Sequence, residues 1–226
     1  MNNTRLRVKD YSTYIFDLDG TLLDTLQDLA ASVNYALRNS HLPEHSLEEV
    51  RFMVGNGVGK LIRRAVPATL SEEETLAVLA KFREYYIDHS EDTTLPYPGI
   101  MDMLQRLRSQ RKQIAVVSNK FDAATKKLCA KYFPGLVDLA IGEDEANGIR
   151  RKPAPDTVLS VINTLGCAKD ECVYIGDSDV DIDTAVNAGI DSISVLWGFR
   201  DKDFLLQHNA QQFISSPDEL AALLDS

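Results

Sequence analysis

The chain has 226 residues, of which 44% are hydrophobic and 26% are charged, and its 34 Asp and Glu against 24 Lys and Arg give a formal net charge of −10. This composition is typical of a globular protein with a substantial core, and it excludes a miniprotein that depends on disulfides. The acidic balance argues against nucleic acid as a partner and leaves a small molecule as the expected one.

Two further features narrow the class of protein. No run approaches the roughly 18 apolar residues of a membrane span, and the N-terminal stretch 1–7 lacks the apolar segment of a signal peptide. We therefore expect a cytoplasmic protein with no membrane partner. The three cysteines fit neither a zinc spacing nor a redox spacing, so we interpret them as reduced thiols.

Alternating strands and helices are predicted for most of the chain. Short apolar runs rich in β-branched and aromatic residues predict buried strands at 14–16, 114–117, 139–141, 173–175 and 193–196. Helical patterns occupy 99–109, 123–131, 155–165 and 181–188, and Pro217 predicts the first turn of a final helix. This alternation favours an α/β fold, a doubly wound parallel sheet of the Rossmann-like kind with helices on both faces.

The first two predicted strands are separated by far more than the roughly thirty residues that a crossover needs. The interval contains helical signals but no convincing strand, and Ser71 with Glu74 predicts a capping box. The apolar positions that follow at helical steps are Leu76, Leu79, Phe82 and Tyr86. We therefore expect a small α-helical cap domain over 24–95, inserted into a core catalytic domain made of 1–23 and 96–226.

Polar side chains follow several predicted strands at the point where each strand ends. Asp17 and Asp19 follow the first strand, Ser118 the second and Asp177 the fourth. Ligands of open parallel sheets lie beyond the carboxyl ends of the strands, so we expect these groups to converge there. Carboxylates held close together repel one another unless a cation lies between them, and Mg²⁺ is the natural oxygen-bound ion. Lys152, just before a predicted helix, would neutralise a phosphate oxygen.

Four ordered motifs carry a resemblance to a known family. They are Phe16-Asp17-Leu18-Asp19-Gly20-Thr21, then Ser118, then Lys152-Pro153, and then Gly176-Asp177 with Asp181 four residues on. In this order and at strand ends they resemble the motifs of the haloacid dehalogenase superfamily, over about residues 12 to 200. The true dehalogenases lack the second aspartate of the first motif, so Asp19 points to the branch that handles phosphate.

The resemblance implies an Mg²⁺-dependent phosphomonoester hydrolase that works through an aspartyl-phosphate intermediate. Asp17 would attack phosphorus, and Asp19 would protonate the leaving alkoxide and later deprotonate the hydrolytic water. Mg²⁺ would be bound by Asp17, by the carbonyl oxygen of Asp19 and by Asp177. The residues implied around them are Ser118, Asn119, Lys152 and the backbone N–H groups near Leu18 and Gly20 for the phosphoryl group, with Asp181 and Ser178 behind the metal.

Within this branch the sequence is similar to phosphoglycolate phosphatases, which makes 2-phosphoglycolate or a similar small phosphorylated metabolite the expected substrate. The similar segments are 24–37, 54–59, 95–99 and 118–120. The glycine-rich loop in 54–59 fits neither a Walker nor a dinucleotide spacing, so it is either a turn between cap helices or a contact for the substrate. For the second interpretation the candidate residues are Gly57, Lys60, Arg63 and Arg64. The run 197–200 is a further candidate for the pocket wall.

Three other functions stay open from the sequence. A sugar phosphomutase such as a β-phosphoglucomutase shares the cap and the motifs but returns the phosphoryl group to a sugar, and a pyrophosphate or nucleotide phosphatase would use the same chemistry. A phosphoacceptor signalling module also combines an acidic pocket, a hydroxyl and a lysine, but such modules are usually shorter and lack a cap. Either a monomer or a homodimer is compatible with the sequence.

Overall fold

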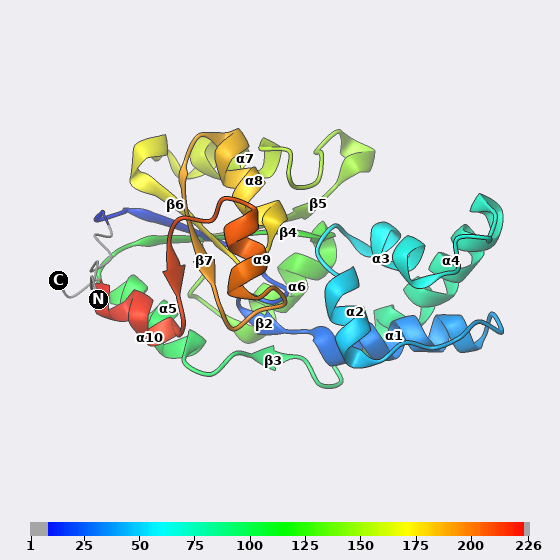
Figure 1. The fold of residues 1–226 in the computed structure, drawn as a ribbon. Helices are drawn as coiled ribbons and strands as arrows, with labels where there is room; N and C mark the ends of the chain where they lie inside the picture. The colour runs from blue at the N-terminus through cyan, green and yellow to red at the C-terminus, as the bar shows by residue number, and fades with distance from the viewer. Residues whose placement is uncertain (1–8, 224–226) are drawn as a thin grey trace.

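A six-stranded parallel sheet forms the centre of the molecule in the computed structural model, which describes residues 9–223 (Figure 1). The N-terminal stretch 1–7, inspected above for a signal peptide, lies outside these residues. The strands follow the order β5-β4-β1-β6-β7-β8, and each neighbouring pair runs parallel. They are β1 (Thr13–Phe16), β4 (Gln113–Phe121), β5 (Leu139–Glu143), β6 (Cys172–Gly176), β7 (Asp191–Val195) and β8 (Phe213–Ile214). The predicted parallel sheet is confirmed, with β8 as an additional strand.

Helices pack on both faces of this sheet, as expected for a doubly wound fold (Figure 1). Alternation along β1 places Tyr14 and Phe16 in one apolar cluster and Ile15 in the other, because successive side chains of a strand point to opposite faces. The first cluster includes residues of α5, α6 and α10, and the second includes residues of α7 and α8. The helices of this part are α5 (Ile100–Ser109), α6 (Asp122–Tyr132), α7 (Asp156–Leu165), α8 (Asp179–Ala188), α9 (Lys202–Gln207) and α10 (Pro217–Leu223), with short 3₁₀ turns at Glu145–Asn147 and Lys169–Glu171.

Between β1 and β4 in the sequence, the chain forms four helices that extend to the right in Figure 1. These helices share an apolar cluster separate from those of the sheet. They are α1 (Leu26–Arg38), α2 (Leu47–Met53), α3 (Val58–Ala65) and α4 (Glu72–His89). The predicted capping box of Ser71 and Glu74 is confirmed. Of the apolar positions predicted on α4, Leu79 and Phe82 are buried and Tyr86 packs against the same cluster. Leu76 differs, because it is 51% exposed and Val78 takes its place on the buried face.

The two chain segments that join these helices to the sheet are paired with each other. β2 (Leu23–Asp24) and β3 (Leu95–Pro96) form a small antiparallel ribbon in which Leu23 faces Pro96 and Asp24 faces Leu95. The ribbon lies at both junctions that the sequence suggested for an inserted cap. Within residues 9–223, no helix combines the length and the apolar character that crossing a membrane requires.

Candidate active site

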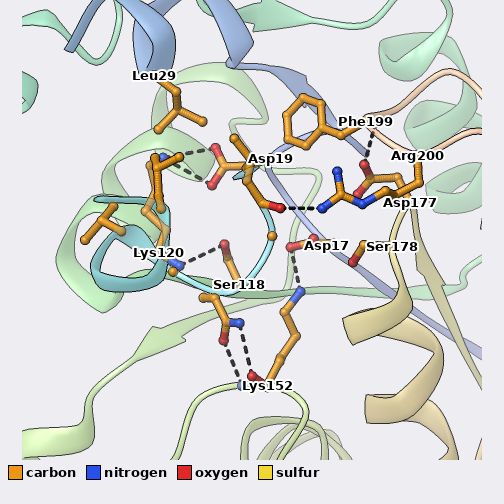
Figure 2. A pocket seen from close by; sticks show the side chains of 16 residues that line it. Asp17, Asp19, Leu29, Ser118, Lys120, Lys152, Asp177, Ser178, Phe199 and Arg200 are labelled. Carbon is orange, nitrogen blue, oxygen red and sulfur yellow. Dashed lines mark hydrogen bonds and ion pairs between the residues drawn. The ribbon is translucent and has the colours of Figure 1, made fainter. Parts of the chain in front are cut away.

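A small pocket of about 60 Å³ lies at the carboxyl ends of the central strands, and residues of α3 and of the loop before it also line it (Figure 2). The sheet contributes Asp17 after β1, Ser118 within β4 and Asp177 after β6 to its wall. Lys152, from the loop before α7, also lines it. The structure thus brings together at one sheet edge the residues that the four sequence motifs contain.

Asp17 lies where β1 ends, and its backbone N–H still donates to the Ile175 carbonyl at 2.9 Å. Its carboxylate is buried, lies 2.8 Å from the Nζ of Lys152 and accepts a hydrogen bond from the Leu18 N–H at 2.7 Å. Burial raises the pKa of Asp17 well above its usual range, and the nearby Asp181 raises it further against the opposing effect of Lys152. Lys152 alone therefore does not fully stabilise the charged form of this carboxylate.

Lys152 joins two carboxylates with a single ammonium. Its Nζ lies 2.8 Å from Asp17 and 2.7 Å from Asp181, and it donates to the Tyr174 hydroxyl at 3.1 Å. Burial alone would lower the pKa of this ammonium, but the two carboxylates more than offset that effect and raise it. Lys152 is therefore held as a fixed positive charge at the pocket floor.

Asn119 holds the backbone of Lys152 in place. Its side-chain amide donates to the Lys152 carbonyl at 3.1 Å and accepts from the Lys152 N–H at 2.7 Å. Both polar atoms of the amide are thus used to orient the lysine, so the amide of Asn119 acts on the pocket through Lys152. The sequence had assigned it a direct contact with phosphate.

Three buried carboxylates, of Asp17, Asp177 and Asp181, each offer one oxygen within 4.8 Å of the others. Asp177 accepts from the Phe199 N–H at 2.6 Å, and Asp181 accepts from the N–H and the hydroxyl of Ser178. Burial and the charge of Asp181 raise the pKa of Asp177 to about 7. The ammonium of Lys152 contacts only Asp17 and Asp181, and the three carboxylates offer only oxygen ligands, so this cluster fits a hard divalent cation.

Gly20 allows the first motif to approach this cluster closely. Its φ of +85° lies in the left-handed region, and a Cβ there would lie 2.5 Å from an Asp177 carboxylate oxygen. Only glycine meets both conditions. The Gly20 N–H donates to the Leu23 carbonyl at 2.9 Å, so the structure gives it a partner other than the phosphoryl group that the sequence suggested.

The carboxylate of Asp19 points away from the three-acid cluster and toward the cap (Figure 2). It accepts from the Nζ of Lys120 at 3.0 and 3.2 Å, and the same ammonium lies 2.6 Å from the hydroxyl of Tyr86 on α4. Burial would lower the pKa of Lys120, but Asp19 and Tyr86 raise it above its ordinary value. The sequence gave no role to Lys120 or Tyr86, because their contact joins segments that are far apart in the chain.

Ser118 is buried in the pocket wall, and its hydroxyl oxygen accepts from the Lys120 N–H at 3.1 Å. The hydroxyl proton is therefore available to an oxygen in the pocket. Ser118 and Lys152 approach the pocket from different segments, which leaves two polar donors beside Asp17. This arrangement can hold a tetrahedral anion against the Asp17 carboxylate.

The cap lines the pocket with apolar residues and glycines, among them Leu29 and Val58, rather than with the cations that the sequence proposed. Gly57 lines the pocket at the start of α3, but in the described part of the chain Lys60, Arg63 and Arg64 are not part of its wall. Arg63 pairs with Glu72, and Arg64 donates to the Met53 carbonyl at 2.7 Å. The sequence of α3 predicts a helix, but it does not show whether the cations of that helix face the pocket or the solvent.

The cation that does reach this end of the pocket is Arg200, next to Phe199 (Figure 2). Both belong to the run 197–200 that the sequence marked as a candidate wall. Phe199 is buried in the apolar cluster of the cap helices, although it lies outside the inserted segment. The run after β7 therefore links the three-acid cluster to the cap, since its Phe199 N–H also donates to Asp177.

Comparisons with known proteins agree with this geometry. A family model described as a haloacid dehalogenase-like hydrolase matches residues 14–195. The chain is 32% identical over 214 residues to the phosphoglycolate phosphatase of Aquifex aeolicus, a match that covers 94% of this chain and 96% of that protein. It is 34% identical over 195 residues to phosphoglycolate phosphatase 1 of Pseudomonas aeruginosa, with 82% and 69% covered.

The fold is also similar to that of solved structures. The crystal structure of a candidate phosphoglycolate phosphatase from Lactobacillus delbrueckii subsp. bulgaricus matches with a TM-score of 0.91 and 37% identity, and it covers 96% of this chain and 99% of that one. The family match extends over β1, β4 and β6, whose ends carry the pocket. The chain belongs to the haloacid dehalogenase-like hydrolase family.

Proposed function

We propose that this protein hydrolyses 2-phosphoglycolate to glycolate and inorganic phosphate. The observation that carries the proposal is the buried Asp17 carboxylate in a small pocket of about 60 Å³ at the ends of the central strands, which suits a small phosphoester. Ser118 and Lys152 lie beside it as phosphoryl contacts. The relatives named as phosphoglycolate phosphatases support this choice of substrate.

The proposed cofactor is Mg²⁺, which the carboxylates of Asp17 and Asp177 and the carbonyl oxygen of Asp19 would hold. Asp181 and Ser178 would fix this arrangement from behind, since Ser178 donates to Asp181 and Asp181 pairs with Lys152. When bound, the ion would supply positive charge that offsets the three buried acids and the phosphoryl oxygens. The raised pKa of Asp177, about 7, supports the need for such a charge.

In the proposed reaction, an Asp17 oxygen attacks phosphorus and the bond from phosphorus to the substrate oxygen breaks. Protonated Asp19 gives its proton to the leaving alkoxide, and an aspartyl-phosphate remains on Asp17. Asp19, now a carboxylate, then accepts a proton from a water molecule that attacks the same phosphorus. Phosphate leaves and Asp17 is restored. Lys120, which contacts both oxygens of Asp19, would hold the side chain of Asp19 in position through both steps.

We also propose that segment 24–95 acts as a cap that moves against the core of 1–23 and 96–226. A closed cap excludes bulk water from the aspartyl-phosphate, and an open one exchanges substrate and product. The paired linkers β2 and β3 are the proposed hinge, because they are the chain connections at the two junctions.

A substrate panel tests the proposed function. The protein is assayed for phosphate release from 2-phosphoglycolate, pyrophosphate, nucleoside monophosphates and hexose phosphates, with Mg²⁺ and with EDTA. We expect the highest kcat/KM on 2-phosphoglycolate and loss of activity with EDTA. A hexose phosphate converted to an isomer without phosphate release would show a phosphomutase instead. A single turnover per molecule would indicate a phosphoacceptor module.

We further propose a cytoplasmic protein that acts as a monomer or a homodimer. The cysteine spacings, which fit neither a zinc site nor a redox motif, support this proposal. Light scattering of the purified chain measures the mass of the assembly and distinguishes the two states.

A further inference from the structure

Arg200 belongs to the segment after β7, outside the cap, but its guanidinium contacts the cap. Its Nη1 donates to the Arg51 carbonyl at 2.9 Å, and its Nη2 donates to the carbonyls of Phe52 and Val54 at 3.2 and 2.7 Å. These carbonyls lie at and just after the C-terminal end of α2, where helix carbonyls lack helical partners. Together with Phe199 in the apolar cluster of the cap helices, Arg200 therefore connects the segment after β7 to the cap.

The positive charge of Arg200 has no carboxylate partner in the described part of the chain. The side chain is only 6% exposed, and its three hydrogen bonds go to neutral carbonyls. Its Nε–H is buried and has no hydrogen-bond partner among residues 9–223. Burial lowers the pKa of this guanidinium, and the charges of Asp177 and Asp179, neither of which forms an ion pair with it, offset the effect only in part. Burying a charge without a partner is costly, so this site is incomplete without an anion.

The other cations of the pocket already have partners. Lys152 pairs with Asp17 and Asp181, and Lys120 pairs with Asp19. Among the residues described, Arg200 is thus the one pocket cation whose charge is not balanced by a direct ion pair. It lies on the cap side of the pocket, whereas Asp17 and Lys152 form the floor (Figure 2).

We infer that Arg200 determines specificity by binding the carboxylate of the substrate, and this inference rests on the proposed function. If the phosphoryl group of the substrate lies against Asp17, a carboxylate one or two carbons from the ester oxygen would lie near Arg200. A carboxylate there accepts from the unused N–H groups of Arg200 and supplies the missing negative charge. Because the same guanidinium binds the carbonyls after α2, the site is complete only when the cap is closed.

The test compares two substrates that differ only in this group. In 2-hydroxyethyl phosphate an uncharged alcohol replaces the carboxylate of 2-phosphoglycolate. The ratio of their kcat/KM values is measured with Mg²⁺ for the full chain and for Arg200→Gln. A hydrogen-bonded charge pair predicts that the preference for 2-phosphoglycolate falls by about tenfold to a hundredfold in the variant. The matched control is Arg38→Gln, an exposed cap arginine paired with Glu44, for which the ratio stays unchanged.

Two further variants separate charge recognition from support of the cap. Arg200→Met fills the volume of the side-chain stem, carries the same expected loss and replaces Arg200→Gln if that variant unfolds. Arg200→Lys keeps the charge with fewer donors, so it should retain an intermediate ratio.

Equal losses on both substrates in every variant would overturn the inference, because Arg200 would then only hold the cap. A wild-type chain that hydrolyses 2-hydroxyethyl phosphate as well as 2-phosphoglycolate would overturn both the inference and the proposed substrate. A wild-type preference for 2-phosphoglycolate that persists in the variants would overturn the role of Arg200 alone.

Discussion

At the scale of single residues, the ammonium of Lys152 contacts the carboxylates of two aspartates. Substitution of Lys152 should therefore lower the catalytic activity. We expect Lys152→Met to lower kcat/KM by about a hundredfold to a thousandfold, because a donor fixed at a reacting phosphoryl group is lost and Asp17 and Asp181 then repel each other. Steady-state phosphate release measures the effect. Lys126→Met, on an exposed lysine that pairs with Asp122, is the control and should keep wild-type kinetics. Comparable losses in the two variants would contradict this role.

The contact of Tyr86 with Lys120 makes a second prediction at this scale. Tyr86→Phe removes one hydroxyl that lies 2.6 Å from the ammonium, so the free energy of unfolding should fall by about 1 kcal/mol. We expect kcat to fall as well, because Lys120 positions Asp19 less firmly. Urea unfolding and kinetics measure the two effects. Tyr85→Phe, the next residue on α4, is the control; an equal fall in kcat there would refute the positioning role.

The site residues that directly follow a buried strand could be predicted from the sequence. Asp17, Ser118 and Asp177 lie at the ends of apolar runs, and parallel strands bring such ends together whatever the rest of the chain does. Contacts between the cap and the core could not be predicted in this way. Lys120 meets Tyr86 across 34 positions, and Arg200 meets Val54 across 146. Only the docking of one unit on the other creates those neighbours.

At the scale of elements, the sheet was predictable because buried strands are apolar throughout, and β1 and β6 show this in their sequences. The elements that were missed are short. β2, β3 and β8 contain two residues each, too few for any periodic pattern. The exposure of Leu76 has another cause. Helical spacing shows which residues share a face, but it does not show where the neighbouring helices lie.

The ribbon of β2 and β3 carries the prediction at this scale. Asp24 and Leu95 face each other, so a disulfide in the double variant Asp24→Cys with Leu95→Cys would stiffen the proposed hinge. We expect oxidation to lower kcat and to change KM, because the proposed cap opening would control substrate entry and product release. A thiol reductant should restore both constants. Each single cysteine variant, oxidised in the same way, is the control. Unchanged constants in the linked protein would argue against this hinge.

At the scale of the whole molecule, the acid cluster couples stability to pH and to metal. The pKa of Asp177 is about 7 in the folded chain without an ion, against an ordinary value of 3.8. Between these values the folded chain holds a proton that the unfolded chain has lost, so stability falls as pH rises through this window. We expect Tm in EDTA to be lower at pH 7.5 than at pH 5 by several degrees. One kcal/mol corresponds to about 2–4 °C at this size.

Divalent metal should reverse this trend, because an ion favours the charged carboxylates and its benefit grows as they ionise. Tm measured with Mg²⁺ should therefore exceed Tm in EDTA by more at pH 7.5 than at pH 5. The net charge of −10 also destabilises the chain as pH rises, so Asp177→Asn serves as the reference. If that variant shows the wild-type dependence on pH in EDTA, the acid cluster is not its source.

The chain leaves the sheet domain through β2 and returns to it through β3, at positions that are hydrogen-bonded neighbours. The whole excursion over 24–95 is therefore topologically a side loop, and the sheet does not need it for its own strand order. A different set of helices, or a short turn, could be joined at the same two points without rethreading the sheet. Protein engineers could thus exchange the helices that cover the pocket and keep the sheet with its cluster of Asp17, Asp177 and Asp181.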